Sequence, residues 1–324
     1  MHKLLIHEAT FARIGGELKR FADKVQPYIM RNDGEIRDAG GNKVSDEADI
    51  TLGYATPDVW FTEAAPHFMK TILGVERLEW FQAAAAGTEH PVLQMLIGKA
   101  EKYTGSHEQA EAIAEWVLWA GFDWLQKGNA RRAAQAAKIW QRIEFRELAD
   151  THWLVVGFGA IGQATARRLR ALGARVTGVR RTPEAHEHAD AMVQPGDMAG
   201  VLSAVDAVLL SLPHTDETEG MADAAFFRAM RSDAMFVNVG RGMLVDEAAL
   251  VAALDAGEID HASLDVTAVE PLPDDSPIWG HGKITLTSHL SADTMGTARR
   301  TDALFLDNLD KFLYGEALKN LVVL

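Results

Sequence analysis

Polar residues suited to acid–base chemistry stand where several apolar, strand-like runs of this sequence end. Arg241 follows AMFVNVG and His289 follows KITLTS, while Asp265 closes HASLD and Glu270 lies in the loop after it. The carboxyl ends of parallel strands share one edge of a sheet, so we expect these side chains to converge. A guanidinium can bind the carboxylate of a 2-oxo acid and polarise its carbonyl. A histidine can exchange a proton, and a carboxylate can orient the imidazole and favour its protonated form.

Each of these residues also has a simpler explanation. A single histidine after a strand is more often structural than catalytic, and a lone arginine or glutamate in a loop is usually a surface charge. Their occurrence together at successive strand ends favours hydride transfer, which needs these roles and takes the hydride from a bound cofactor.

The stretch WLVVGFGAIGQATARRLRALG indicates where such a cofactor binds. It has Gly157, Gly159 and Gly162 in the G-x-G-x-x-G spacing, directly after an apolar strand pattern and at the start of a helical one. These glycines would permit a tight turn, close approach of a pyrophosphate and close helix–strand packing, in that order. The helix N-terminus at Ala160 and Ile161 would offer N–H groups to the phosphates. The alternative is a glycine-rich turn without a ligand.

The next strand pattern, VTGVRRT, indicates the type of dinucleotide. NAD-preferring folds place an acid about 20 residues after the first glycine, whereas arginine there accommodates a 2′-phosphate. This sequence has Arg180, Arg181 and Thr182 instead, which we call the phosphate clamp. The clamp predicts NADP(H) as the preferred cofactor, with NAD(H) as the alternative. Its simpler interpretation is a solvated turn, as is that of the nearby His186 and His188, so we expect no metal.

Strand-like runs and helical patterns alternate along the whole chain. A series of six runs, most of them separated by helical patterns, predicts a doubly wound dinucleotide-binding domain over residues 104–295: THWLVVGFG, ARVTGVRR, DAVLLSLP, AMFVNVG, HASLDV and KITLTSH. Residues 1–103 alternate in the same way. An amphipathic helix over 297–318 is expected to return to this first part, giving a substrate domain of 1–103 plus 296–324. The predicted fold class is α/β, with two Rossmann-like domains of doubly wound parallel sheet and an active-site cleft between them.

The segment 108–128 has apolar residues on more than one stripe of a helix, including three tryptophans. Such a helix needs burial on several sides. It is either a core helix bridging the two domains or part of a subunit interface, and its periodicity does not distinguish these two interpretations.

Composition excludes several classes of function. The formal net charge of −14 would repel a polyanion, so we expect no nucleic-acid partner. The chain has no cysteine, which excludes disulfides and thiolate chemistry and fits the reducing cytoplasm. The apolar run Leu4–Ile6 is too short for the core of a signal peptide, and no segment has the roughly 20 apolar residues needed to cross a bilayer. We therefore expect a cytoplasmic protein without a membrane partner.

Taken together, these motifs resemble the D-isomer-specific 2-hydroxyacid dehydrogenases, nearest to the glyoxylate/hydroxypyruvate reductase branch. The resemblance is specific from residue 152 to 295, where the blocks VVGFGAIG, LLSLPHTDET, MFVNVGRGMLVDEAAL, SLDVTAVEPLPDDSPIW and TLTSHLSA are similar to the family's blocks, in order. It is weaker before residue 104. Glu270 stands where the related formate dehydrogenases carry glutamine, which argues against formate chemistry. The chain ends without the regulatory domain of many phosphoglycerate dehydrogenases, so serine biosynthesis is less expected.

The resemblance implies a role for each site residue. Arg241 holds the substrate, Glu270 pairs with the histidine, and His289 is the general acid in reduction. It further implies cofactor contacts at Leu212, Pro213 and Val239 and, on the nicotinamide side, at Asp265. Substrate contacts are implied at the backbone of Ala86 and Gly87, with Tyr54 as a pocket residue.

The expected function is an NADPH-preferring reductase of small 2-oxo acids, such as glyoxylate or hydroxypyruvate, that gives D-2-hydroxy acids. The resemblance also implies a homodimer. The alternative is a binding protein that senses dinucleotides without turnover, like the transcriptional corepressors that share this fold.

Overall fold

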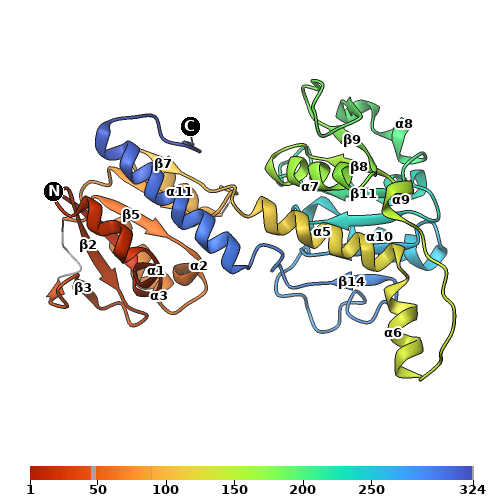
Figure 1. Ribbon diagram of the computed structural model, residues 1–324, viewed down its shortest axis with the longest axis horizontal. Helices are drawn as coiled ribbons and strands as arrows, with labels where there is room; N and C mark the ends of the chain where they lie inside the picture. The colour runs from red at the N-terminus through yellow and green to blue at the C-terminus, as the bar shows by residue number, and fades with distance from the viewer. Residues whose placement is uncertain (45–48, 89, 323–324) are drawn as a thin grey trace. The chain divides into compact units, whose positions relative to one another are not determined.

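The computed structural model describes residues 1–44, 49–88 and 90–322, and it divides into two compact units (Figure 1). Unit 1 comprises residues 1–108 and 294–324, and unit 2 comprises residues 109–293. The sequence-based division, residues 1–103 plus 296–324 and residues 104–295, stays a prediction. Within the described residues, each unit contains one seven-stranded sheet.

Unit 2 is built on a parallel sheet with the strand order β10-β9-β8-β11-β12-β13-β14. All six predicted strands are present: β8 (His152–Val156), β9 (Arg175–Val179), β11 (Ala207–Leu210), β12 (Met235–Asn238), β13 (His261–Leu264) and β14 (Ile284–Leu286). They are mostly apolar because helices cover both faces of the sheet. The three-residue edge strand β10 (Ala191–Val193) was not predicted, since it is short and only partly buried.

The two faces of this sheet have separate cores, because successive side chains of a strand point to opposite sides. Trp153 and Val155 of β8 pack under α5 (Ala110–Leu125) and α7 (Ala160–Ala171). Leu154 and Val156 belong to the other core, which α8 (Ala199–Leu202), α9 (Ala224–Ala229) and α10 (Glu247–Ala256) cover. The short helix α6 (Gly128–Ala136) follows α5. The 3₁₀ turns are η2 (Leu148–Asp150), η3 (Pro195–Asp197) and η4 (Gly242–Leu244).

Unit 1 has the strand order β4-β3-β2-β1-β5-β6-β7, in which β3 and β4 form an antiparallel edge. Its strands are β1 (His2–His7), β2 (Val25–Met30), β3 (Ile36–Asp38), β4 (Lys43–Val44), β5 (Leu52–Ala55), β6 (Trp80–Ala83) and β7 (Tyr103–Thr104). Strands β2, β3, β4 and β7 were not predicted. Pro27 lies inside β2 and argues against a strand on sequence alone, while β3, β4 and β7 have at most three residues.

The C-terminal helix α11 (Met295–Tyr314) belongs to unit 1. Its Phe305 and Leu309 pack with residues of α1 (Glu8–Leu18) and η1 (Lys19–Phe21) on one face of the sheet (Figure 1). The helices α2 (Pro57–Trp60), α3 (Ala64–Gly74) and α4 (Pro91–Lys99) pack on the other face. Helix α11 ends earlier than residue 318, because Gly315 adopts the left-handed conformation that closes helices. In the described part of the chain, no helix is long and apolar enough to span a bilayer.

Candidate active site

The turn between β8 and α7 has the backbone geometry that a dinucleotide needs. Gly157 has a φ of 94°, and a Cβ there would lie 2.7 Å from the carbonyl oxygen of Ser211. A Cβ at Gly162 would collide with the carbonyl oxygen of Gly157, so α7 packs directly on the turn. In front of Gly159, by contrast, there is open space for 4 Å. The turn is therefore tightly packed at Gly157 and Gly162 and open at Gly159, which fits a pyrophosphate that approaches the backbone at Gly159.

The N-terminus of α7 leaves donors for an anion beside this open space. Gly159 is the N-cap residue and has no capping side chain, and Ala160 is exposed in the first turn with Ile161 half-buried after it. The first backbone N–H groups of a helix lack partners within the helix and carry its positive dipole end. These groups suit phosphate oxygens.

Three apolar residues predicted to line the cofactor follow strands at the same sheet edge. Leu212, just after β11, is partly buried, and its Cδ2 atom lies 3.0 Å from where a Cβ of Gly157 would be. Pro213 is exposed, whereas Val239, after β12, is 5% exposed and therefore buried. Leu212 therefore lies beside the glycine turn, and Val239 contributes mainly to the core.

The phosphate clamp follows β9, the strand next to β8. Arg180, Arg181 and Thr182 are all exposed. Within the described part of the chain, neither arginine side chain has an ion-pair partner. Two guanidinium groups without a carboxylate, one strand away from the glycine turn, suit a phosphate on the ligand.

His289 and Glu270 form a direct pair. The Nδ1 atom of His289 lies 2.8 Å from Oε2 of Glu270, at hydrogen-bond distance. The other carboxylate oxygen of Glu270 accepts the backbone N–H of Thr267 at 3.1 Å, which fixes its orientation. A carboxylate on one ring nitrogen sets the tautomer and leaves the Nε2 atom for a second partner. About half of the imidazole is exposed.

Asp265 holds the loop that carries this histidine. Its carboxylate is 1% exposed and accepts hydrogen bonds from the Thr287 hydroxyl at 2.6 Å, from the Leu290 N–H at 3.0 Å, and from the N–H and hydroxyl of Ser291. The N–H of His289 donates to the Asp265 carbonyl at 2.7 Å, and His289 has a φ of 54°. A non-glycine residue with this φ needs such support. Asp265 thus has a structural role, and its implied contact with nicotinamide stays a prediction.

Arg241 lies in the turn between β12 and η4. Its Nη1 atom donates to the Gly240 carbonyl at 2.8 Å, and the buried Asn238 side chain bonds to both Gly240 N–H and the Arg241 carbonyl. A Cβ on Gly242 would collide with the backbone of Thr267, three residues before Glu270. The Arg241 turn is therefore packed against the loop that holds Glu270. Sequence analysis missed Asn238, although a polar residue inside the apolar run FVNVG could have indicated it.

In unit 1, the predicted substrate loop lies between β6 and α4. Ala86 is exposed and Gly87 is half-buried. The carbonyl of Ala85, next to them, accepts the Ser106 N–H at 2.9 Å, which holds the beginning of this loop. Backbone N–H groups in such a loop can bind a carboxylate, and this assignment stays a prediction.

Tyr54 differs from its prediction as a pocket residue. Its ring is fully buried in the core of unit 1 and stacks on Phe305 with centroids 4.0 Å apart. The hydroxyl donates to Asp302 at 2.8 Å, and burial raises the pKa of Tyr54 well above its usual range. Asp302 also binds Arg13 at 2.7 Å. A buried ring with a satisfied hydroxyl cannot line a pocket, so the role of Tyr54 is structural.

We expect Tyr54→Phe to lower the free energy of unfolding by about 1–3 kcal/mol, because the Oδ1 atom of the buried Asp302 loses its short hydrogen bond and keeps only the Arg13 Nη2 donor at 3.5 Å. The kcat and KM values should stay unchanged. Urea unfolding and steady-state kinetics check this result. A raised KM with unchanged stability would return Tyr54 to the substrate pocket.

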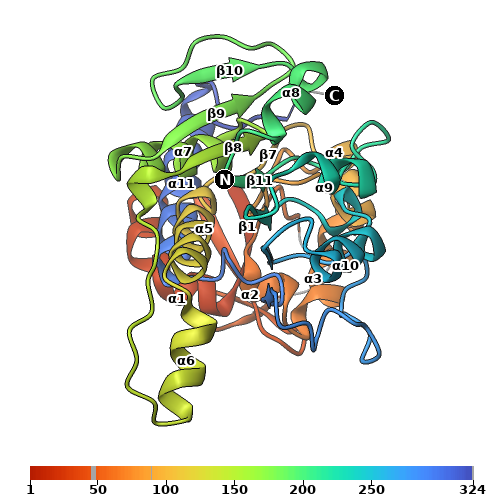
Figure 2. The ribbon, with the colours of Figure 1, turned by 90° about the vertical axis from the view of Figure 1, so that its right-hand side faces the viewer.

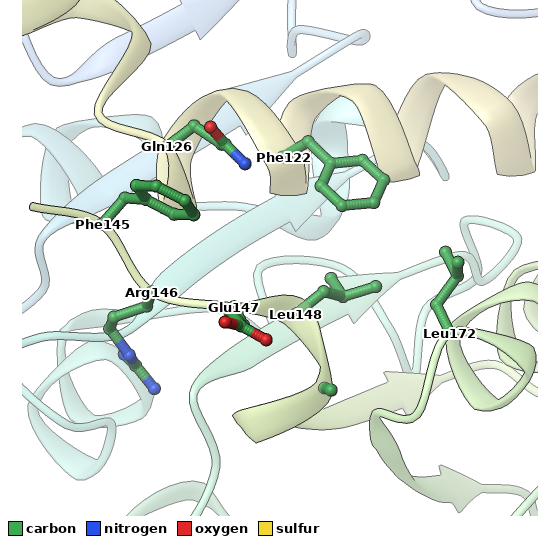
Figure 3. A pocket seen from close by; sticks show the side chains of 8 residues that line it. Phe122, Gln126, Phe145, Arg146, Glu147, Leu148 and Leu172 are labelled. Carbon is green, nitrogen blue, oxygen red and sulfur yellow. The ribbon is translucent and has the colours of Figure 1, made fainter.

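A pocket of about 240 Å³ lies on unit 2, away from these residues (Figure 3). Phe122 and Gln126 of α5, residues 145–149 and Leu172 line it. Residues 145–149 precede β8, and Leu172 follows α7, so the pocket is near the amino ends of the strands. The glycine turn, Arg241 and Asp265 lie at the opposite edge. The pocket is therefore a feature of the surface and not part of the candidate active site.

Comparisons with known proteins agree on one family. Residues 118–291 match the family model described as D-isomer specific 2-hydroxyacid dehydrogenase, NAD binding domain. The chain is 41% identical over 225 residues to glyoxylate/hydroxypyruvate reductase B of Citrobacter koseri, covering 65% of this chain and 67% of that enzyme.

Two solved structures extend the similarity to nearly the whole chain. A D-isomer specific 2-hydroxyacid dehydrogenase of Xanthobacter autotrophicus in complex with NADPH and MES has a TM-score of 0.76 at 25% identity. A family protein of Aeromonas salmonicida has a TM-score of 0.79, also at 25% identity. Each match covers 99% of this chain and 98% of the other.

Proposed function

The chain belongs to the D-isomer-specific 2-hydroxyacid dehydrogenases, a family of NAD(P)-dependent oxidoreductases, and we propose that it is an NADPH-preferring reductase of small 2-oxo acids such as glyoxylate and hydroxypyruvate. Its products would be D-2-hydroxy acids. The observation that carries the proposal is the His289–Glu270 pair, in a loop packed against the Arg241 turn, at the sheet edge that bears the glycine turn. The name of the Citrobacter relative supports the substrate class.

In this proposal a bound nicotinamide supplies the hydride, and the protein supplies binding and proton transfer. Arg241 binds the substrate carboxylate and polarises the carbonyl that is reduced. The Nε2 atom of His289 gives a proton to the carbonyl oxygen as it becomes a hydroxyl. Glu270 stabilises the imidazolium before transfer and keeps the ring oriented. The backbone at Ala86 and Gly87 adds donors to the carboxylate. Location in the cytoplasm stays a prediction.

The phosphate clamp should decide which nicotinamide cofactor is used. We expect Arg180→Ala/Arg181→Ala to raise the KM for NADPH at least about tenfold, because charge-assisted hydrogen bonds of about 1.5–3 kcal/mol to the 2′-phosphate are lost. The KM for NADH should change little. Oxidation of both cofactors is followed by absorbance with glyoxylate, hydroxypyruvate, pyruvate and phenylpyruvate. Arg228→Ala, at an exposed arginine of α9, is the matched control.

Each outcome of this assay has a distinct meaning. Turnover that favours NADPH, with the preference lost in the double variant, supports both the reaction and the clamp. Turnover that favours NADH keeps the dehydrogenase and removes the clamp. Saturable NADPH binding without turnover on any of these acids would favour the dinucleotide-sensing alternative.

We also propose that the protein is a homodimer assembled through the outer side of α5. This helix buries Trp116 and Trp124 in unit 2, while Trp119 and Phe122 stay 47% and 38% exposed. Helix α6 and the segment after it extend away from the sheet (Figure 2), and Trp140 in that segment is fully exposed. Exposed aromatic surface of this kind marks an interface. A second copy of this chain is the partner we propose, because unit 2 has both the projecting segment with Trp140 and the pocket lined by Phe122. In a symmetric dimer, the segment of each copy can contact the pocket of the other.

We expect Trp119→Glu/Phe122→Glu to give a particle of 35.4 kDa, whereas the unmodified protein should have twice that mass. The interface would then bury four uncompensated charges, two from each copy, which outweigh the apolar contacts there. Light scattering after size-exclusion chromatography measures both masses. Phe61→Glu alters an equally apolar but 85% exposed residue of unit 1, and its mass should stay at the dimer value. A monomeric unmodified protein would refute the dimer.

A further inference from the structure

The loop that carries the phosphate clamp has two fixed points. The backbone N–H of Arg180 donates to the Val193 carbonyl at 3.1 Å, which ties the start of the loop to β10. Within the described part of the chain, residues 181–185 make no hydrogen bond, and the next contacts are those of His186. The clamp residues Arg181 and Thr182 therefore lie on a free stretch of backbone between Arg180 and His186.

His186 joins this loop to the glycine turn through an aromatic contact. Its ring meets Phe158 edge to face, with centroids 5.1 Å apart and planes at 75°. Phe158 is the residue between the first two glycines of the motif and is only 2% exposed. A Cβ on Gly178 of β9 would lie 2.6 Å from the Phe158 ring, so this ring rests directly on the strand. Phe158 is thus a rigid support for the imidazole.

His186 also closes a turn in its own backbone. Its Nδ1 atom accepts the N–H of His188 at 3.2 Å, and its carbonyl accepts the N–H of Ala189 at 3.0 Å. The ring contact and this turn are separable, since a phenylalanine keeps the first and an asparagine keeps the second. This separation allows a direct test of the ring contact.

We propose that His186 is a positioning residue for the 2′-phosphate, which acts by fixing the phosphate clamp loop to Phe158 of the glycine turn. The inference rests on the proposed preference for NADPH. A loop held at both ends loses less conformational entropy when its arginines engage a phosphate. NADH has no 2′-phosphate, so its binding gains nothing from an ordered clamp loop. His186 therefore contributes to cofactor choice without contacting the cofactor.

The test compares two ligands that differ only in the 2′-phosphate: adenosine 2′,5′-bisphosphate and adenosine 5′-monophosphate. Isothermal titration calorimetry on the full chain should show that His186→Asn binds the bisphosphate about 2- to 10-fold more weakly, the range of an aromatic pair. Its affinity for the monophosphate should be unchanged. His186→Phe keeps the ring and should bind both ligands like the unmodified protein. The KM for NADPH should rise wherever the affinity for the bisphosphate falls. The KM for NADH should stay unchanged, as the affinity for the monophosphate does.

A double-mutant cycle gives a second readout. Phe158→Leu combined with His186→Asn should weaken bisphosphate binding no more than Phe158→Leu alone, because both changes remove the same contact. The inference is overturned if His186→Asn binds the bisphosphate normally, if both ligands weaken equally, or if His186→Phe is as poor as His186→Asn. Thermal unfolding of each variant excludes a general loss of structure. An unmodified protein that does not discriminate between the two ligands would instead remove the clamp, and with it the proposed NADPH preference.

Discussion

Replacing Arg241 by alanine is expected to lower kcat/KM for glyoxylate and hydroxypyruvate by about 10²–10³-fold, the range for loss of a donor that stabilises a developing oxyanion. The guanidinium is held in place by its bond to the Gly240 carbonyl and by Asn238, which fixes the turn. The binding of NADPH, measured by fluorescence titration, should be nearly unchanged, because the glycine turn and the clamp lie on other loops.

Two further variants test whether that loss of kcat/KM comes from the missing guanidinium of Arg241. Arg241→Lys keeps a positive charge but cannot bind a carboxylate in a bidentate way, so it should recover only part of the activity. Arg231→Ala removes an arginine of the same unit that pairs with Asp233, and its kcat/KM should match the unmodified protein. Normal turnover in Arg241→Ala would refute its role in the substrate site.

Replacing His289 by glutamine is expected to lower the rate of reduction by about 10²–10⁴-fold, because the general acid is lost. Reduction uses the protonated imidazole and oxidation uses the neutral one. In the unmodified protein, reduction should therefore fade as the pH rises, and oxidation should gain. Steady-state rates in both directions measure this dependence. His281→Gln, at another loop histidine paired with a carboxylate, is the control and should leave both profiles unchanged.

Glu270→Gln separates the charge of the pair from its geometry. An amide oxygen can still accept from the Nδ1 of His289, but it no longer stabilises the imidazolium. Glu270→Gln should therefore lower the rate of reduction, with a smaller loss than in His289→Gln. A pH-independent rate in the unmodified protein, with chemistry shown to limit turnover, would argue against His289 as the proton donor.

Local patterns in the sequence were sufficient for most of unit 2. The six strands of 151–289 are mostly apolar, because a parallel sheet covered on both faces needs no polar alternation. The glycine spacing, the clamp and the order of Arg241, Glu270 and His289 are likewise visible in the chain. Unit 1 was less readable: Pro27 interrupts the strand pattern of β2, and the edge strands are too short to show a period.

The sequence by itself determined which chemical groups are present and at which strand ends they stand. Only the tertiary structure decided how they are used. Tyr54 follows the pattern of a strand-end pocket residue, yet the packing of α11 buries it against Phe305 and Asp302. The carboxylate of Asp265 accepts hydrogen bonds from the loop of His289, from residues 22 to 26 positions later in the chain. Such partners lie far apart in sequence, and their pairing depends on how helices and loops pack, which no local spacing encodes.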